Sequence, residues 1–126
     1  MKVVLLGKAT AETEAGVMPT MEALAEMDAF NEALVNAGVA VIGGAGLQPS
    51  ARGVRVYFDG TKRTIVDGPF TETKEVVAGF AIWQVKSMEE ALEWVKRSPF
   101  RDGGVELRPI FEPEDFGEAF TPERQP

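Results

Sequence analysis

The sequence predicts an α+β fold in which two helices cover one face of an antiparallel sheet. Three observations predict it: continuous apolar runs typical of buried strands, two helical segments with an apolar residue every three or four positions, and an alternating segment with a tight turn. The chain has 126 residues, of which 44% are apolar, enough for one hydrophobic core. We expect one domain over residues 1–111 and an acidic C-terminal tail over residues 112–126.

Six segments are expected to form strands. They lie at residues 3–6, 39–42, 54–58, 63–66, 76–85 and 105–108. The first and fifth runs are almost wholly apolar, which is typical of central strands buried on both faces. The third run alternates like a half-buried strand, and Asp59-Gly60 predicts a hairpin turn that joins it to the fourth. Pro109 indicates that the last strand lies at an edge of the sheet.

Both expected helices begin with a capping residue. The first begins at Pro19 or Thr20 and ends at Gly38. The second begins with a capping box formed by Ser87 and Glu90. The expected apolar stripes are Met21, Leu24, Met27, Phe30 and Leu34 in the first helix, and Met88, Ala91, Leu92 and Val95 in the second.

Two connecting segments have a distinctive composition. Residues 9–18 show no clear period, which predicts a mobile loop. The glycine-rich residues 43–46 invite comparison with a phosphate-binding loop, but they lack its Lys-Ser/Thr pair and are not followed by a helix. We therefore expect these glycines to permit a β-bulge or a close dimer contact.

The order of the elements predicts the topology. Without the hairpin it is strand–helix–strand–strand–helix–strand, the split βαβ arrangement of ferredoxin-like folds. Such a fold leaves one sheet face bare, yet the strands at residues 3–6 and 80–85 offer no polar face. An exposed apolar sheet of that size calls for a partner. We expect a homodimer that closes sheet against sheet; the alternative is a monomer covered by its own tail.

Composition and charge exclude several kinds of partner and site. The formal net charge of −7 provides no basic stripe for nucleic acid. The absence of cysteine and histidine removes disulfides, thiolate nucleophiles and the commonest metal ligand. The carboxylates show no fixed ligand spacing, so we expect neither a metal nor another cofactor. No apolar run approaches the roughly 20 residues of a membrane span, so we expect a cytoplasmic protein that binds no membrane.

Residues 67–75 form the most distinctive segment, a shaped corner between two apolar strands. Asp67 and Gly68 favour a turn, and Pro69 fixes its own φ. Asp67 has two interpretations: a general base whose pKa is raised by apolar surroundings, or a cap of its own turn, which is the commoner role. Lys74 and Glu75 could polarise a carbonyl substrate and accept a proton, or could be surface charges, with Lys74 paired across the turn.

The corner sequence Asp67-Gly68-Pro69-Phe70, followed by Glu72-Thr73-Lys74-Glu75, occurs with Gly46-Leu47-Gln48-Pro49-Ser50 and Gly79-Phe80. Together these segments resemble the DGPF subgroup of the YCII-related domain family, and the resemblance covers residues 1–111. Residues 114–117 also resemble an extension seen in this subgroup.

The resemblance implies a ferredoxin-like chain that forms a dimeric α/β barrel with a cleft beside the sheet. The wider family includes proposed small-molecule enzymes, among them a dehydrochlorinase that acts on an aromatic ring compound. Members of the subgroup are often encoded beside extracytoplasmic-function sigma factors, which implies a protein partner. The enzymes of the family are thought to use a histidine of the first helix with a nearby aspartate. This chain has no histidine, and Asp28 and Asn31 are the polar residues of that neighbourhood.

A cleft beside the corner would receive polar groups from two segments, since Gln48 and Ser50 follow a strand end. The expected ligand-binding residues are Gln48, Ser50, Asp67, Phe70, Thr73 and Lys74, and the candidates for a catalytic role are Asp67 and Lys74. Three functions stay open. The chain binds or transforms a small metabolite, or it is a regulatory partner of a protein such as a sigma factor, or it is a non-catalytic structural dimer.

Overall fold

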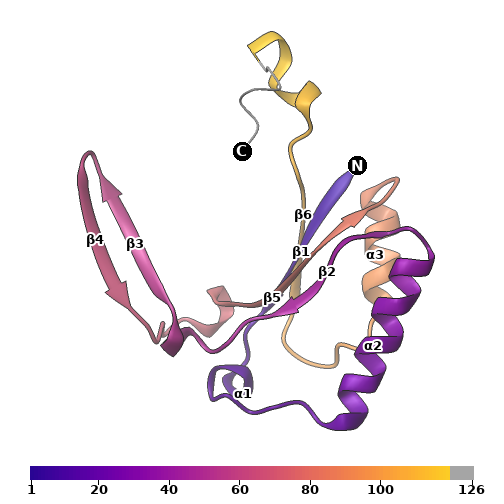
Figure 1. Cartoon of the computed structure of the whole chain (residues 1–126), viewed down its shortest axis with the longest axis horizontal. Helices are drawn as coiled ribbons and strands as arrows, with labels where there is room; N and C mark the ends of the chain where they lie inside the picture. Colours follow the sequence, from indigo (N-terminus) through magenta and orange to yellow (C-terminus); the bar gives the residue numbers. More distant parts are fainter. Residues whose placement is uncertain (120–126) are drawn as a thin grey trace.

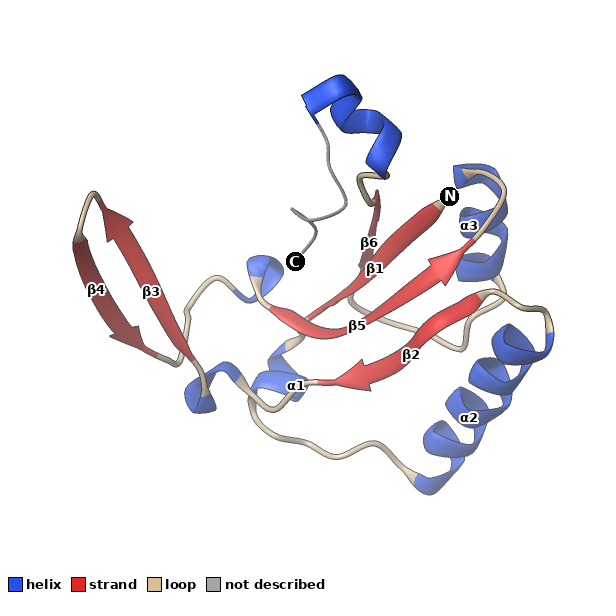
Figure 2. Ribbon diagram, turned by 45° about the horizontal axis from the view of Figure 1, so that its top comes forward, coloured by secondary structure: helices blue, strands red, loops and turns tan. Residues whose placement is uncertain are grey.

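The chain folds into a four-stranded sheet with helices on one face and a two-stranded hairpin that projects from it (Figures 1 and 2). The computed structural model describes residues 1–119, apart from the side chains of Lys74, Glu118 and Ala119. The elements are β1 (Lys2–Lys8), α1 (Ala11–Glu14), α2 (Met21–Asn36), β2 (Ala40–Gly46), β3 (Val54–Asp59), β4 (Lys62–Asp67), β5 (Val77–Gln84), α3 (Met88–Lys96) and β6 (Val105–Pro109). Short 3₁₀ segments lie at Ser50–Arg52, Thr73–Glu75 and Pro113–Ala119.

The main sheet has the strand order β2-β5-β1-β6, and every neighbouring pair is antiparallel. Strands β5 and β1 are central, as their apolar runs predict, and in their register Val3 lies opposite Trp83. Strand β6 lies at an edge of the sheet, where the missing N–H of Pro109 interrupts no hydrogen bonds between inner strands. The predicted α+β class is confirmed, with antiparallel sheets and three α-helices among the described residues.

The hydrophobic core lies between the sheet and helices α2 and α3. Phe30 of α2 meets the rings of Trp83 and Trp94 edge-on, at centroid distances of 6.4 and 6.3 Å. The buried core residues are Val3, Leu5, Leu34, Val39, Ala81, Trp83, Val85, Ala91 and Trp94. Because these residues come from one face of the sheet, the opposite face contributes none of them.

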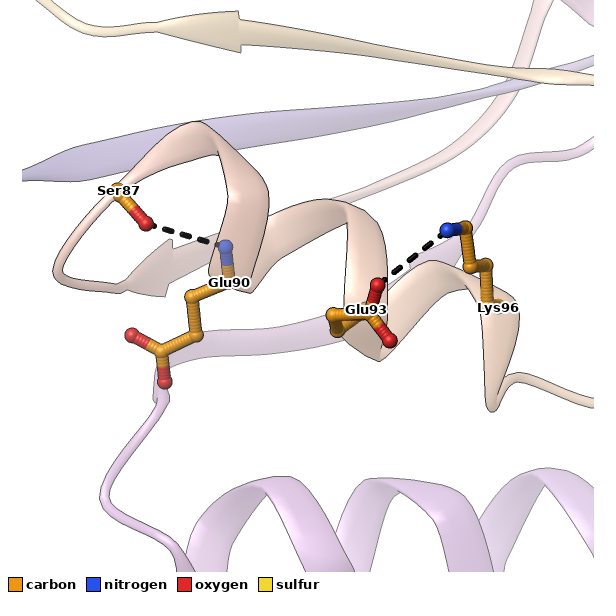
Figure 3. A network of polar contacts seen from close by, with 4 residues as sticks. All are labelled: Ser87, Glu90, Glu93 and Lys96. Atoms are coloured by element: carbon orange, nitrogen blue, oxygen red, sulfur yellow. Dashed lines mark hydrogen bonds and ion pairs between the residues drawn. The ribbon is translucent and has the colours of Figure 1, made fainter.

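Helix α3 begins at the predicted cap (Figure 3). The hydroxyl oxygen of Ser87 accepts a hydrogen bond from the N–H of Glu90 at 3.2 Å. The predicted capping box is incomplete, because the Glu90 carboxylate accepts from the N–H of Lys86, at 2.7 Å, and not from that of Ser87. The expected stripe is wrong at Leu92, which is 47% exposed, because Trp94 fills the core position instead. One turn later, Lys96 and Glu93 form an exposed ion pair at 3.2 Å.

Helix α2 contacts the core only through its C-terminal half. Thr20 caps it as predicted, accepting from the N–H of Ala23 at 3.1 Å. Leu34 is buried, whereas Met21 is 83% exposed and Leu24 is 45% exposed. The predicted stripe therefore faces the core in its last turns, while its first turns face away from all described residues of the core.

Two connections differ from their simplest expectation. Residues 11–14 form α1 rather than an irregular loop, because Thr10 and Thr13 each accept a hydrogen bond from the other's backbone N–H, at 3.2 and 2.8 Å. Strand β2 runs on through the glycine-rich residues 43–46. Its register against β5 shifts between Ala40 and Ile42 and again between Ile42 and Ala45, the kind of interruption that the expected β-bulge would produce.

The hairpin of β3 and β4 has the predicted turn but not the predicted burial. Its register runs from Val54 opposite Asp67 to Asp59 opposite Lys62, and Gly60 takes a φ of 60° in the turn. Every residue of both strands is exposed, so the expected half-burial is wrong within this chain. The hairpin stands out on the side of the molecule away from α2 and α3 (Figures 1 and 2).

The segment after β6 returns to the start of the chain. The backbone N–H of Lys2 donates to the Glu112 carboxylate at 3.2 Å, and the rings of Phe111 and Phe116 lie 5.2 Å apart. The expected tail thus begins with ordered turns, and its part from residue 120 onward lies outside the described residues. None of the described helices has the length and apolar character needed to cross a membrane.

Candidate functional site

A hollow of about 610 Å³ lies where the hairpin joins the rest of the chain. Its apolar wall consists of Leu47, Pro49, Phe70, Val76 and Val77. Its polar groups are Gln48, Ser50, Arg52, Arg55 and Glu75, beside the backbone of Gly53. The volume falls within the range of small-molecule sites, and the mixture of apolar wall and few polar groups is typical of them.

Positive charge gathers in this hollow although the chain as a whole is acidic. Among the described residues, its lining contains Arg52 and Arg55 and one carboxylate, that of Glu75, while the net charge of the chain is −7. The guanidinium carbon of Arg55 lies 3.8 Å from the centroid of the Phe70 ring, a cation–π contact. Among the described residues no hydrogen bond or ion pair engages the Arg55 guanidinium, so its N–H groups can bind a second partner. The hollow therefore favours an anion beside an apolar surface.

Ser50 joins three segments beneath the hollow. Its side chain is buried, and its hydroxyl donates a short hydrogen bond to the Glu14 carboxylate at the end of α1. The same carboxylate accepts from the N–H of Ser50 at 2.9 Å, and the Ser50 hydroxyl accepts from the N–H of Phe70 at 3.0 Å. The hydrogen bonds from the Ser50 side chain and backbone hold the pKa of Glu14 below its usual value.

The corner at residues 67–70 packs against the same serine through its glycine. The N–H of Gly68 donates to the carbonyl oxygen of Gly53 at 3.0 Å. A Cβ at Gly68 would overlap the carbonyl oxygen of Ser50, lie 2.7 Å from its carbonyl carbon and 3.3 Å from the Cα of Ala51. Only glycine fits there, since the backbone of the corner touches the backbone of the Ser50–Arg52 turn. Residues 67–70 are thus held against the Ser50–Arg52 turn, and this packing places the Phe70 side chain in the wall of the hollow.

The structure brings together half of the predicted ligand-binding residues. Gln48, Ser50 and Phe70 line the hollow. Asp67 does not: it lies at the end of β4, exposed, and within the described part of the chain its carboxylate forms no hydrogen bond or ion pair. Thr73 opens a 3₁₀ turn outside the lining, and the side chain of Lys74 lies outside what the structure describes.

The polar residues of α2 lie elsewhere. Asp28 is exposed, and the amide of Asn31 lies against Gly44 of β2, within 4 Å of where a Cβ there would stand. Neither residue lines the hollow. Over residues 1–119, no three His, Cys, Asp or Glu side chains are grouped to hold a metal ion.

Arg52 and Arg55 are the functional candidates that the sequence interpretation missed. The available signal was the pair of arginines three positions apart, on either side of Gly53, in an acidic chain. Arg55 also occupies a polar position of an alternating strand, which is ordinarily a solvent-facing position. Its contact with Phe70 joins residues 15 positions apart, and local pattern gives no sign of it.

Comparisons with known proteins agree with this fold. One solved structure is the 5-chloro-2-hydroxyhydroquinone dehydrochlorinase (TftG) from Burkholderia phenoliruptrix AC1100, in complex with 2,5-dihydroxybenzoquinone. It is similar to this chain with a TM-score of 0.50 and 17% sequence identity, over 91% of this chain and 98% of that one. A search of curated proteins finds no match. The YCII-related domain model matches residues 1–114, and the chain therefore belongs to the YCII-related domain family.

Proposed function

We propose that this protein binds, and in its full function transforms, a small acidic metabolite with an apolar or aromatic part. The observation that carries the proposal is the pair Arg52 and Arg55 in a hollow of about 610 Å³, with Arg55 stacked on the Phe70 ring. An arginine fork recognises a carboxylate or phosphate through two parallel hydrogen bonds. The wall formed by Leu47 and Val76 would take the apolar part of the same molecule.

The structural neighbour supports a ring compound as the ligand class. TftG is a dehydrochlorinase and is crystallised with 2,5-dihydroxybenzoquinone, a small planar molecule. In this chain a planar ligand would lie along the Arg55–Phe70 stack. If proton transfer occurs, it falls to Glu75, whose carboxylate is the one that lines the hollow among the described residues. Asp67, one of the two candidates for a catalytic role in the sequence, lies outside that lining.

We further propose the finer assignments that the family suggests: the DGPF subgroup, a ferredoxin-like chain, and a homodimer that closes into an α/β barrel. The strand order β2-β5-β1-β6 with both core-forming helices on one face supports the topology. On the open face, Val4 lies opposite Ile82 and Leu6 opposite Phe80, an apolar patch suited to a second sheet. A cytoplasmic location remains a prediction.

Two other functions remain predictions without a structural observation in their favour. One is regulatory docking of a protein such as a sigma factor, and the other is a structural dimer without a ligand. The hollow and its arginines would have no role in either, and this difference makes the ligand proposal testable.

The test measures binding of 2,5-dihydroxybenzoate, a planar ring with one carboxylate, by isothermal titration calorimetry. Arg55→Met keeps much of the apolar stem but removes the charge, so we expect the dissociation constant to rise about ten-fold or more. Arg101→Met is the matched control, because Arg101 is an exposed arginine that pairs with Glu26 outside the hollow.

Native mass spectrometry of protein purified without added ligand gives a second readout. A bound small acid that is retained by the wild type and by Arg101→Met, but lost in Arg55→Met, would support the proposal. Equal affinity of all three proteins for the acid would refute it. If no acid in a panel of benzoates and aliphatic dicarboxylates binds the wild type, the proposal is refuted as well.

A further inference from the structure

The short segment of residues 9–14 binds two parts of the wall of the hollow, one at each of its ends. At its start, the N–H of Ala9 donates to the carbonyl oxygen of Val76 at 2.8 Å. At its end, both oxygens of the Glu14 carboxylate accept from Ser50, one from the N–H and the other from the hydroxyl. The threonine capping box described above fixes the turn of α1 between these ends. Val76 and Ser50 line the hollow, so this segment supports the hollow without lining it.

The Glu14 carboxylate decides in which direction the Ser50 hydroxyl donates. An ionised carboxylate only accepts hydrogen bonds, whereas a hydroxyl has one proton to donate and two lone pairs that accept. Because the Ser50 proton is directed at Glu14, a lone pair of the same oxygen is left for the N–H of Phe70, which donates to it at 3.0 Å. A hydrogen bond to a charged group is roughly twice as strong as one between neutral groups, so Glu14 is the stronger of the two partners of this hydroxyl.

The N–H that Ser50 holds belongs to the residue on which Arg55 stacks. The guanidinium carbon of Arg55 lies 3.8 Å from the centroid of the Phe70 ring, and no printed ion pair or hydrogen bond of residues 1–119 holds that guanidinium in another way. Its position in the hollow therefore depends on its own strand and on the Phe70 ring. A continuous path of contacts leads from Glu14 through Ser50 and Phe70 to the guanidinium.

We propose that Glu14 is a positioning residue of the hollow: through Ser50 it holds Phe70, and with it the Arg55 guanidinium, in the place where an acidic ligand binds. The inference rests on the proposed function for the ligand, but the positioning itself can be observed without one. Without the carboxylate, the Phe70 corner would adopt further arrangements besides the one seen here. Only a fraction of the molecules would then present the stack in place, and the apparent affinity falls in proportion to that fraction.

Glu14→Gln tests the proposal because glutamine keeps the size and shape of the side chain. Its amide has one acceptor oxygen for the two donors of Ser50, so one of the two hydrogen bonds is lost. Glu12→Gln is the matched control: Glu12 is an exposed residue of the same helix, and its substitution removes the same charge. With circular dichroism showing each variant folded, we expect the dissociation constant of 2,5-dihydroxybenzoate to rise about five-fold in Glu14→Gln and less than about two-fold in Glu12→Gln.

Nuclear magnetic resonance of the protein without ligand gives a second readout. Protons above the face of an aromatic ring resonate upfield, so the side-chain protons of Arg55 report on its stacking with Phe70. In Glu14→Gln these protons should move toward their random-coil positions. Arg97, which lies 4.1 Å from the centroid of the Trp94 ring at the end of α3, is the internal reference, and its protons should not move. A role of Glu14 in global stability alone would leave both arginines unchanged in the folded protein.

Ser50→Ala interrupts the same path one step later. Because both substitutions act through Phe70, the double variant Glu14→Gln/Ser50→Ala should bind within about two-fold of Ser50→Ala alone. Additive losses, unchanged Arg55 protons in Glu14→Gln, or equal losses in Glu14→Gln and Glu12→Gln would each overturn the proposal. If the wild type binds no acid while the Arg55 protons move as expected, the proposed function fails and the positioning of the stack stands. If the wild type and Glu14→Gln bind the acid equally well, the proposed function stands and the positioning role fails.

Discussion

Gly68→Ala should be the most damaging single-methyl change in the hairpin region. The added Cβ would overlap the carbonyl oxygen of Ser50 and lie 2.7 Å from its carbon, where backbone rather than a flexible side chain must give way. To relieve the contact, the corner must move away from the Ser50–Arg52 turn. That movement breaks the hydrogen bond from Gly68 to Gly53 and the one from Phe70 to the Ser50 hydroxyl.

The cost can be estimated from these parts. Overpacking of a closed contact costs about 1–3 kcal/mol, and each lost hydrogen bond adds roughly 0.5–1.5 kcal/mol. We therefore expect the free energy of unfolding to fall by about 3 kcal/mol and the melting temperature by roughly 10 °C. For a protein whose total stability is of order 5–15 kcal/mol, this is a large fraction.

Urea unfolding, followed by tryptophan fluorescence, measures the effect. Gly104→Ala is the control, because a Cβ there has no neighbour within 4 Å and its φ is not in the left-handed region. The control should be neutral, or more stable by up to about 1 kcal/mol through reduced freedom of the unfolded chain. If Gly68→Ala unfolds within about 0.5 kcal/mol of the wild type, the packing of the corner against Ser50 is not what the structure indicates.

Two further substitutions test local hydrogen bonds. Because the folded-state pKa of Glu14 is lowered by Ser50, its contribution to stability is present above the ordinary value of 4.5 and is lost as the pH falls through the folded-state pKa. Glu14→Gln should therefore be less stable than the wild type near neutral pH, and urea unfolding across a pH series should show this difference in unfolding free energy narrowing below about pH 4.5. The exposed Glu32→Gln should show no such difference. A difference between Glu14→Gln and the wild type that does not depend on pH would contradict the assignment. Ser87→Ala removes the cap that accepts from the N–H of Glu90 and should lower the unfolding free energy by about 1 kcal/mol, so an unchanged unfolding midpoint would show that the cap is dispensable.

Features encoded by neighbouring residues could be predicted well. The Ser87 cap, the Asp59-Gly60 turn and the bulge in residues 43–46 each depend on the chemistry of a few consecutive positions. The edge position of Pro109 follows equally directly, since a residue without an N–H cannot serve an inner ladder. The family resemblance at the corner reached further, because it pointed to YCII-related proteins without requiring any contact to be known.

Features that depend on distant contacts could not be predicted in the same way. The bonds between Ser50 and Glu14 join residues 36 positions apart, and the stacking of Arg55 on Phe70 joins two elements whose approach is set by the fold. As a result, the lining of the candidate site includes Arg55, which was not predicted, and excludes Asp67, which was. Gln48, Ser50 and Phe70 line it as predicted. Alternation in the hairpin indicated an apolar face, but the half-burial expected from it does not occur against any described residue of the chain.

The way in which the β3–β4 hairpin is attached to the rest of the chain makes it separable from the main sheet. Val54 pairs with Asp67, and one step further in, the N–H of Gly68 meets the carbonyl oxygen of Gly53 at 3.0 Å, so the chain leaves and re-enters the body at a single point. A short turn joining residues 53 and 68 would close the backbone without displacing any strand of the main sheet. A change in the length of this hairpin should therefore leave the main sheet intact. Because the hairpin also carries Arg55, its removal would take one of the two arginines out of the lining of the hollow.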